Sequence, residues 1–280
     1  MFEIVKKREL NPTVTLMEVD APFVARKAEP GQFIILRVDE EGERIPLTVA
    51  DFDREKGTVT IIFQIVGGTT ERLNHLNEGE YIQDFVGPLG EPSHTEGLKK
   101  VAVVGGGVGC AIAYPVAKKL HEQGAEVHSV VGFRNKDLVI LEEEFSAVSN
   151  VFKMMTDDGS YGEKGLVTDA LKALIEAGNS YDEVIAIGPV VMMKFVSLLT
   201  RQYGIKTVVS MNPIMIDGTG MCGCCRLTVA GKTRFACVDG PDFDGHEVDY
   251  DEILKRASTY KEFEAKEREK ACNLFKKEVR

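Results

Sequence analysis

The sequence has no excess of positive charge and no apolar run long enough to cross a bilayer. Its 280 residues include 34 Lys and Arg against 44 Asp and Glu, a net charge of −10. Nucleic acids and anionic membranes attract basic patches, so this balance argues against both as partners. An uncharged stretch at residues 101–117 falls short of the ~20 residues that span a bilayer, and it contains several glycines and Pro115.

A secretory leader is also missing from the first residues, where Lys6, Lys7 and Arg8 already stand in a strand-like segment. Six cysteines are present, and four of them fall between residues 222 and 237. Without a secretory signal, such clustering is typical of metal ligation rather than of disulfides. We therefore expect a cytoplasmic protein with a metal centre.

The N-terminal third is rich in short strand patterns. Runs of Val, Ile, Phe and Thr, separated by Gly or Pro, occupy residues 14–19, 32–38, 58–66 and 81–86. Several short strands with little helix between them predict a small antiparallel β barrel over residues 1–97.

From residue 98 the pattern changes to alternating buried strands and helices. Strands are predicted at residues 101–104, 127–132, 184–187 and 207–210, and helices at residues 110–123, 165–177 and 191–203. This alternation predicts an open, mostly parallel sheet covered on both faces, an α/β domain over residues 98–210.

The last region, residues 211–280, has two parts. Residues 211–248 are rich in Gly and Cys, follow neither period, and need a metal centre to supply order. The charged tail from Asp249 to Arg280 places apolar residues at roughly helical spacing, among them Ile253, Tyr260 and Phe263.

The cysteines form the pattern Asp217-x4-Cys222-x2-Cys225-x11-Cys237, with Cys224 inside the loop. With Cys in place of Asp217, the first three positions would have the spacing of plant-type [2Fe–2S] ferredoxins. A structural zinc site is the alternative, although zinc knuckles normally use two C-x2-C pairs. Asp217 precedes a glycine and is open to a second interpretation as an ordinary turn residue.

A glycine-rich loop follows the first buried strand of the α/β region and opens a helix, a context that suits a pyrophosphate. The loop comprises Gly105, Gly106, Gly107, Val108 and Gly109. It is an incomplete dinucleotide motif, because Cys110 takes the place of the last glycine and no acidic residue ends the next strand. Arg134, after that strand, has three interpretations: a contact to a ribose, to a 2′-phosphate, or to solvent only.

Two segments of the barrel are also candidates for cofactor binding. Period-two alternation puts Arg44, Pro46 and Thr48 on one face of a strand, where a guanidinium suits a phosphate and the hydroxyl suits a flavin edge. Gly67, Gly68, Thr69 and Thr70 precede a helical stretch and form a second possible anion site. Each also has a simpler explanation, a solvated arginine and a helix cap.

Taken in order, these motifs resemble the ferredoxin–NADP reductase superfamily, and within it the electron-transfer subunits of dihydroorotate dehydrogenase. The matching segments are residues 30–33, 44–48, 67–70, 87–90, 105–109, 188–189 and 237–243, over essentially the whole chain. Those subunits have Cys where this chain has Asp217. The departure resembles the small subunit of NADH-dependent reduced ferredoxin:NADP oxidoreductases, the electron-bifurcating transhydrogenases, in which an aspartate is the first cluster ligand.

The resemblance implies a six-stranded FAD-binding barrel, a nicotinamide domain and a C-terminal [2Fe–2S] module with a helix. It assigns FAD to Arg44, Pro46, Leu47, Thr48, Gly67, Gly68, Thr69 and Thr70. It assigns NAD(H) to the loop 105–109 and to Gly188 and Pro189. Arg134, which could bind a 2′-phosphate, leaves NADP(H) as the alternative nucleotide. It assigns the cluster to Asp217, Cys222, Cys225 and Cys237.

The implied activity is electron transfer among NAD(H), FAD and the cluster, and onward to a larger flavin and iron–sulfur subunit in a heterodimer. A flavin accepts a hydride and a cluster accepts single electrons, so no catalytic acid or base is expected. Two alternatives stay open: an electron-transfer subunit of dihydroorotate dehydrogenase, and a zinc-stabilised adaptor without catalytic activity.

Overall fold

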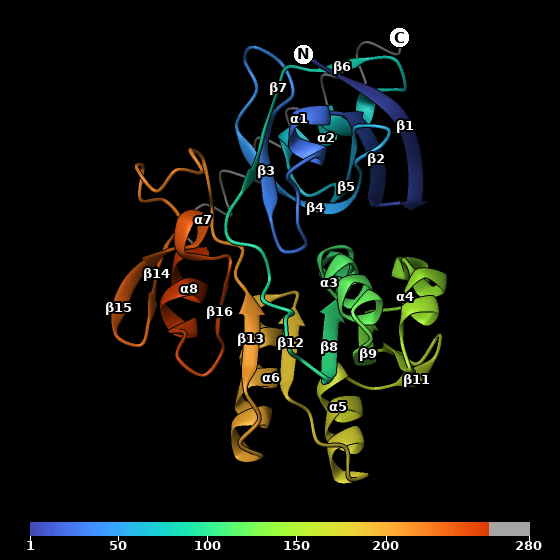
Figure 1. The fold of residues 1–280 in the computed structure, drawn as a ribbon. Helices are drawn as coiled ribbons and strands as arrows, with labels where there is room; N and C mark the ends of the chain where they lie inside the picture. The colour runs from blue at the N-terminus through green and yellow to red at the C-terminus, as the bar shows by residue number, and fades with distance from the viewer. Residues whose placement is uncertain (258–280) are drawn as a thin grey trace.

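The protein, described here by a computed structural model of residues 1–257, contains three regions in chain order (Figure 1). An antiparallel barrel comes first, a parallel sheet with helices follows, and a small module with a two-stranded hairpin comes last. In the view of Figure 1 the barrel lies above the parallel sheet, and the C-terminal module lies at one side of that sheet. Within the described residues, no helix combines the length and the apolar character that crossing a bilayer requires.

The barrel sheet runs in the order β6-β1-β2-β5-β4-β3-β7, and every neighbouring pair is antiparallel. Its strands are β1 (Phe2–Asn11), β2 (Val14–Asp20), β3 (Phe33–Arg37), β4 (Ile45–Asp53), β5 (Thr58–Gln64), β6 (Tyr81–Ile82) and β7 (Asp84–Leu89). Two short helices accompany them, α1 (Pro22–Ala25) and α2 (Gly68–His75). Alternation sets the core: in β2, Met17 and Val19 are fully buried while Glu18 between them is not.

One segment nearly closes the barrel. Strand β6 pairs with β1 at one edge of the sheet, and β7 pairs with β3 at the other. Only Gln83 separates the two strands, and its N–H bonds to the carbonyl of Val38. The resemblance implies six strands; the structure has seven because this break divides the last one.

The parallel sheet runs in the order β11-β10-β9-β8-β12-β13-β16, and β16 alone is antiparallel to its neighbour. The parallel strands are β8 (Lys100–Gly106), β9 (Glu126–Phe133), β10 (Val151–Thr156), β11 (Glu163–Lys164), β12 (Glu183–Ile187) and β13 (Thr207–Ser210). The α-helices of this region are α3 (Cys110–Glu122), α4 (Glu142–Val148), α5 (Val167–Glu176) and α6 (Val190–Gln202).

Both faces of this sheet are buried, as the continuous apolar strands predict. On β8, Val101 and Val103 pack with residues of α3 and α4, while Ala102 and Val104 pack with residues of α5 and α6. All four side chains have no exposed surface. A strand that is apolar on both faces therefore separates two helical layers.

The C-terminal module is joined to the parallel sheet by a strand of its own. Its elements are β14 (Arg226–Val229), β15 (Lys232–Phe235), α7 (Ala236–Asp239), β16 (Asp242–Asp244) and α8 (Tyr250–Ala257). Strand β16 pairs with β13, with Phe243 opposite Val209. The helical pattern predicted for the tail is confirmed in α8, whereas Tyr260, Phe263 and the rest of the tail lie outside the described residues.

Candidate functional site

A cleft of about 940 Å³ lies between the barrel and the carboxyl end of the parallel sheet. It brings together predicted site residues from both regions: Pro46, Leu47, Thr48, Thr70, Gly106, Gly107, Val108, Gly109, Arg134, Gly188 and Pro189. The other predicted residues do not line it: Arg44, Gly67, Gly68, Thr69 and Gly105. Most of the predicted flavin and nicotinamide residues thus face one shared space.

The barrel wall of the cleft is the first half of β4. Pairing with β3 places Thr48 opposite Phe33 and Pro46 opposite Ile35. Pro46, Leu47 and Thr48 are half-buried and line the cleft together, whereas Arg44, expected on the same face as Pro46 and Thr48, does not line it. After Thr48 the strand enters the barrel core, where Val49 is fully buried.

Arg44 precedes β4 and points toward the cysteine-rich loop. Its Nε donates a hydrogen bond of 2.8 Å to the backbone carbonyl of Ile216. The two terminal guanidinium nitrogens have no protein partner among residues 1–257. The arginine therefore joins barrel and loop while keeping donors for another group.

The Gly-Gly-Thr-Thr segment forms the amino end of α2. The Thr70 hydroxyl accepts hydrogen bonds from the N–H groups of Val66 and Gly67, each at 3.0 Å, and donates to the Gly67 carbonyl. The Thr69 hydroxyl donates to the Glu43 carboxylate at 3.0 Å. This is the helix-cap arrangement, and Thr70 also borders the cleft.

The nucleotide wall of the cleft consists of two loops after adjacent parallel strands, β8 and β12. A side chain at Gly109 would lie 2.6 Å from the Cα of Gly188 and from the Ile187 carbonyl oxygen. A side chain at Gly188 would lie 3.1 Å from the Cα of Gly106. The glycines thus let two backbones touch at the carboxyl end of the sheet, the usual ligand position in open α/β folds.

Cys110 begins α3, in the place of the last glycine of the motif. Its side chain is fully buried, its sulfur accepts a hydrogen bond from the backbone N–H of Gly132, and burial raises the pKa of the thiol well above its ordinary value. A neutral buried thiol packs against Gly105, where an added Cβ would lie 2.9 Å from the sulfur. Cys110 is therefore a packing residue.

Arg134 follows β9 and is exposed at the edge of the cleft, where it has no side-chain partner within residues 1–257. Asp157, at the end of the adjacent strand β10, also lines the cleft. Its N–H bonds to the Phe133 carbonyl at 3.0 Å, which holds the two strand ends together. The dinucleotide motif predicts an acidic residue at the end of β9. Asp157 instead follows the neighbouring strand β10 and lies beside Arg134.

Several cleft residues were not predicted. They comprise Ser210, the last residue of β13, and Met211, Asn212, Pro213 and Met215, which follow it. The sequence signal that could have identified them is their position at the carboxyl end of a predicted parallel strand, where ligands bind in open α/β folds. The Met211 N–H bonds to the Pro241 carbonyl at 2.9 Å, so this segment is also fixed to the C-terminal module.

The clustered cysteines form two thiol pairs. Buried Cys225 and Cys237 have their sulfurs 3.2 Å apart. Burial, followed by the hydrogen bond to Cys225, raises the pKa of Cys237 to about 12. Cys222 is exposed and next to half-buried Cys224, whose backbone N–H lowers the pKa of Cys222, while the Cys222 side chain raises the pKa of Cys224.

Asp217 organises the loop that holds these thiols. Its Oδ2 accepts hydrogen bonds from the Thr219 hydroxyl at 2.6 Å, the Thr219 N–H at 3.1 Å and the Met221 N–H at 3.2 Å. The bond from the Thr219 hydroxyl is the main reason that the pKa of Asp217 is lowered. The carboxylate is thus held ionised near Cys222, to whose sulfur the Asp217 N–H also donates.

The chemistry of these donors fits an iron–sulfur cluster. Gly220 donates its N–H to the Cys237 sulfur, and the N–H groups of Asp217 and Cys224 point to Cys222, which is how a protein stabilises thiolate ligands. Across residues 1–257, no three Cys, His, Asp or Glu side chains are arranged as a metal site. Three predicted ligands, Asp217, Cys222 and Cys225, lie in one loop, and Cys237 lies in α7 after the β14–β15 hairpin; their roles stay a prediction.

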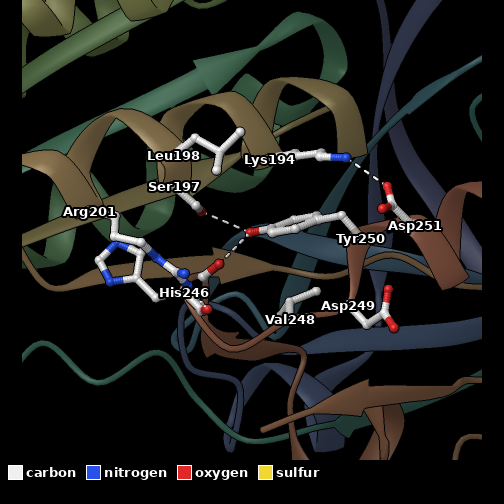
Figure 2. Close-up of a pocket in the computed structure, with 10 residues that line it drawn as sticks. Lys194, Ser197, Leu198, Arg201, His246, Val248, Asp249, Tyr250 and Asp251 are labelled. Carbon is white, nitrogen blue, oxygen red and sulfur yellow. Dashed lines mark hydrogen bonds and ion pairs between the residues drawn. The ribbon is translucent and has the colours of Figure 1, made fainter. Parts of the chain in front are cut away.

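A second pocket, of about 250 Å³, lies between α6 and the segment that leads into α8 (Figure 2). Figure 2 shows the Tyr250 hydroxyl directed at the Ser197 hydroxyl, and Lys194 paired with Asp251. The Tyr250 hydroxyl lies 2.8 Å from the Ser197 hydroxyl and donates to the Gly245 carbonyl at 3.0 Å, and the Lys194–Asp251 ion pair measures 2.6 Å. No predicted site residue lines this pocket. Its polar groups bind one another and fix α8 to α6.

Comparison with known proteins agrees with this site. The family of the iron–sulfur cluster binding domain of dihydroorotate dehydrogenase B matches residues 212–249. The dihydroorotate dehydrogenase B electron transfer subunit homolog of Thermotoga maritima is 50% identical, covering 94% of this chain and 92% of the relative. The electron transfer subunit of Shouchella clausii is 34% identical, covering 88% of this chain and 96% of the relative.

The chain belongs to the family of dihydroorotate dehydrogenase B electron-transfer subunits. A solved structure is also similar over its whole length: a chain of NADH-dependent reduced ferredoxin-NADP oxidoreductase, determined for insight into flavin-based electron bifurcation. The TM-score is 0.92 at 47% identity, and the match covers 96% of this chain and 97% of that one.

Membership in the dihydroorotate dehydrogenase B electron-transfer family confirms an oxidoreductase subunit that transfers electrons. It confirms the predicted barrel, parallel sheet and iron–sulfur module. At the level of the family it also confirms FAD, NAD(H) and the iron–sulfur cluster as cofactors. A partner subunit follows from this membership, whereas the partner's identity stays a prediction.

Proposed function

We propose that this chain is the small subunit of an electron-bifurcating NADH-dependent ferredoxin:NADP oxidoreductase in the cytoplasm. The observation that carries the proposal is the single cleft shared by the flavin-type strand β4 and the two glycine loops of the parallel sheet. A flavin and a nicotinamide need such a space to meet directly. The full-length similarity to a chain of that enzyme supports the choice within the family.

The residues of the cleft have distinct roles in this proposal. Residues 1–97 bind FAD, with Pro46, Leu47 and Thr48 along the ring and Thr70 at the phosphate end of the site. Gly67, Gly68 and Thr69 shape the amino end of α2 beside this wall, and Arg44 offers its terminal guanidinium nitrogens to a flavin phosphate. Residues 98–210 bind NAD(H), with Gly106–Gly109 and Gly188–Pro189 allowing the close backbone approach seen between β8 and β12.

Residues 211–280 form the cluster module, with Asp217, Cys222, Cys225 and Cys237 as ligands. When bound, the flavin supplies the change from two-electron to one-electron transfer, and the cluster supplies the one-electron relay. The chain itself binds and orients the cofactors and donates backbone N–H groups to the sulfurs. A larger flavin and iron–sulfur subunit is the partner in a heterodimer.

Anaerobic purification tests this proposal. We expect one FAD and two iron atoms per chain, and bleaching of the flavin spectrum by NADH. Stoichiometric zinc in place of iron would support the adaptor alternative instead. Copurification of the native protein should yield a subunit that contains flavin and iron–sulfur clusters.

The second candidate is the electron-transfer subunit of dihydroorotate dehydrogenase, because the family itself carries that name. Asp217 distinguishes the two, since the resemblance implies Cys at this position in the orotate-linked subunits. Copurification separates them directly: a partner that oxidises dihydroorotate supports the second candidate, and one that reduces NADP supports the first.

A further inference from the structure

Two adjacent residues before β4 connect two loops that are far apart in the sequence. The Glu43 carboxylate accepts a hydrogen bond from the hydroxyl of Thr69, a buried residue at the amino end of α2. The next residue, Arg44, donates from Nε to the carbonyl of Ile216. Through these two hydrogen bonds, residues 43 and 44 form a bridge between the two loops.

The loop on the Arg44 side lies directly on the barrel. A Cβ at Gly218 would lie 2.7 Å from Leu89 Cδ1 and 2.8 Å from Ile35 Cδ1, so the loop backbone touches strands β7 and β3. Gly218 has a φ of 82°, which favours glycine at this contact. Arg44 thus binds the loop where it already rests on the barrel.

Arg44 also fixes the backbone immediately before the cluster loop. The carbonyl that it binds belongs to the residue preceding Asp217, whose own carboxylate holds the N–H groups of Thr219 and Met221. A displaced peptide at this point would displace the carboxylate and the turn that depends on it. The terminal guanidinium nitrogens, in contrast, stay available to an anion from the flavin side.

We propose that Arg44 is a positioning residue that couples FAD binding in the barrel to the stability of the iron–sulfur loop. This inference rests on the proposed function. It adds that one side chain binds both a flavin phosphate and the Ile216 carbonyl. A flavin phosphate on the terminal nitrogens restricts the arginine to the rotamer in which Nε holds the Ile216 carbonyl. Coupling is reciprocal, so an ordered loop strengthens FAD binding by the same factor.

The test measures how fast the cluster is lost to an iron chelator, followed by visible absorbance and by electron paramagnetic resonance of the reduced protein. Wild type is compared with Arg44→Gln and Arg44→Lys, each with saturating FAD and after removal of FAD. Arg54→Gln is the matched control, because Arg54 also binds a barrel carbonyl, that of Ala28, but does not reach the loop. Circular dichroism establishes that each variant is folded.

We expect removal of FAD to speed cluster loss in wild type about tenfold, the factor that one net hydrogen bond represents. Arg44→Gln should lose the cluster at the fast rate with or without FAD, and Arg54→Gln should behave as wild type. Arg44→Lys keeps the charge but lacks Nε, so it should retain FAD yet lose the cluster quickly.

Two results overturn the inference. One is a wild-type cluster lifetime that does not depend on FAD. The other is an Arg44→Gln or Arg44→Lys protein, loaded with FAD, whose cluster lasts as long as in wild type. A wild-type protein without FAD or iron contradicts the proposed function itself, and the coupling with it.

Discussion

The Nε of Arg44 binds the Ile216 carbonyl, and within residues 1–257 its two terminal nitrogens remain free to bind a flavin phosphate. The contribution of Arg44 to FAD affinity can therefore be measured by substitution. Arg44→Ala removes a charge-assisted contact to phosphate worth ~1.5–3 kcal/mol, so FAD should bind roughly ten- to hundredfold more weakly. Fluorescence titration of the stripped protein with FAD measures the change. An unchanged dissociation constant would make Arg44 a surface residue that serves only the loop.

The cluster ligands can be separated from the spare thiol by single substitutions. Cys222→Ser, Cys225→Ser and Cys237→Ser should lose or alter the cluster, whereas Cys224→Ser should leave its spectrum intact. Asp217→Cys should keep a cluster with a shifted spectrum, because a carboxylate is a harder donor than a thiolate, and Asp217→Ala should make it labile. Iron content and electron paramagnetic resonance are the measurements.

A contrary pattern would be equally clear. Loss of the cluster in Cys224→Ser, together with a normal spectrum in Asp217→Ala, would mean an all-cysteine ligand set. In the structure, Cys224 lies next to the Cys222 thiol, and the Asp217 carboxylate binds the turn at Thr219. Either residue could therefore be the fourth ligand, and comparing these two variants decides between them. An all-cysteine set would also favour the orotate-linked alternative.

Individual residues show what sequence reasoning can reach. Local spacing was enough to bring Thr48, Gly107 and Gly188 to one cleft, because each belongs to a motif whose backbone conformation is set nearby. The contact from Arg44 to Ile216 spans most of the chain, and no periodicity encodes it. Asp157 was missed for a similar reason, since only strand pairing places it beside Arg134.

At the level of elements, we expect the residues that follow β9 and β10 to set the preference between NADH and NADPH. Arg134 offers a positive charge to a 2′-phosphate, but the Asp157 carboxylate on the next strand repels one. We expect NADH to reduce the flavin at least about tenfold faster than NADPH, the factor for ~1.4 kcal/mol. Stopped-flow bleaching measures both rates.

Variants of the two residues give the control for this preference. Arg134→Ala should leave NADH the better donor, and Asp157→Asn should narrow the difference between the two nucleotides. Faster reduction by NADPH that disappears in Arg134→Ala would instead identify Arg134 as a contact to the 2′-phosphate.

The contact between α6 and α8 depends on a buried hydroxyl (Figure 2). Tyr250→Phe leaves the Ser197 hydroxyl and the Gly245 carbonyl without that partner, so the free energy of unfolding should fall by about 1–3 kcal/mol. Tyr203→Phe is the matched control, because the Tyr203 hydroxyl binds Glu176 at the surface and its loss should cost at most ~0.5 kcal/mol. Chemical denaturation of both variants measures the difference; equal stabilities would contradict the prediction.

The positions of strands and helices were predictable where a segment is rich in β-branched residues or has apolar residues at helical spacing. Strands β2, β8, β12 and β13 and helices α5 and α6 begin and end within two residues or so of their predicted bounds. Strand β10 (Val151–Thr156) was not predicted, because Lys153 and two methionines interrupt the β-branched pattern. The break at Gln83 also has no local signal, since it arises from pairing with two different strands.

At the scale of the whole molecule, a buried histidine makes stability depend on pH. His128 is 2% exposed, between the Tyr181 hydroxyl at 2.8 Å and the Glu126 carboxylate at 2.9 Å. Burial is the main reason that its pKa is lowered from 6.5. The unfolded chain therefore binds the proton more readily, so the folded state loses stability as pH falls through about 6.5.

His128→Gln removes this dependence. Thermal midpoints measured between pH 8 and pH 5.5 should decline more steeply for wild type than for the variant. Other titrating groups are common to both proteins and cancel in the comparison. Parallel declines would mean that His128 titrates alike in the folded and unfolded chains.

Strand β16 changes how the cysteine-rich segment behaves as a polymer. Residues 211–241 leave the sheet after Ser210 and return at Asp242, which is paired with Ser210. The segment is thus a closed loop with both ends hydrogen-bonded to one rigid edge, rather than a free tail. The β13–β16 pairing already closes this loop, so cluster binding does not have to provide the conformational entropy cost of closure. That cost grows only with the logarithm of loop length. We therefore expect a chain that has lost its iron to keep its thiols within a confined volume, so that a cluster is rebuilt at the same place.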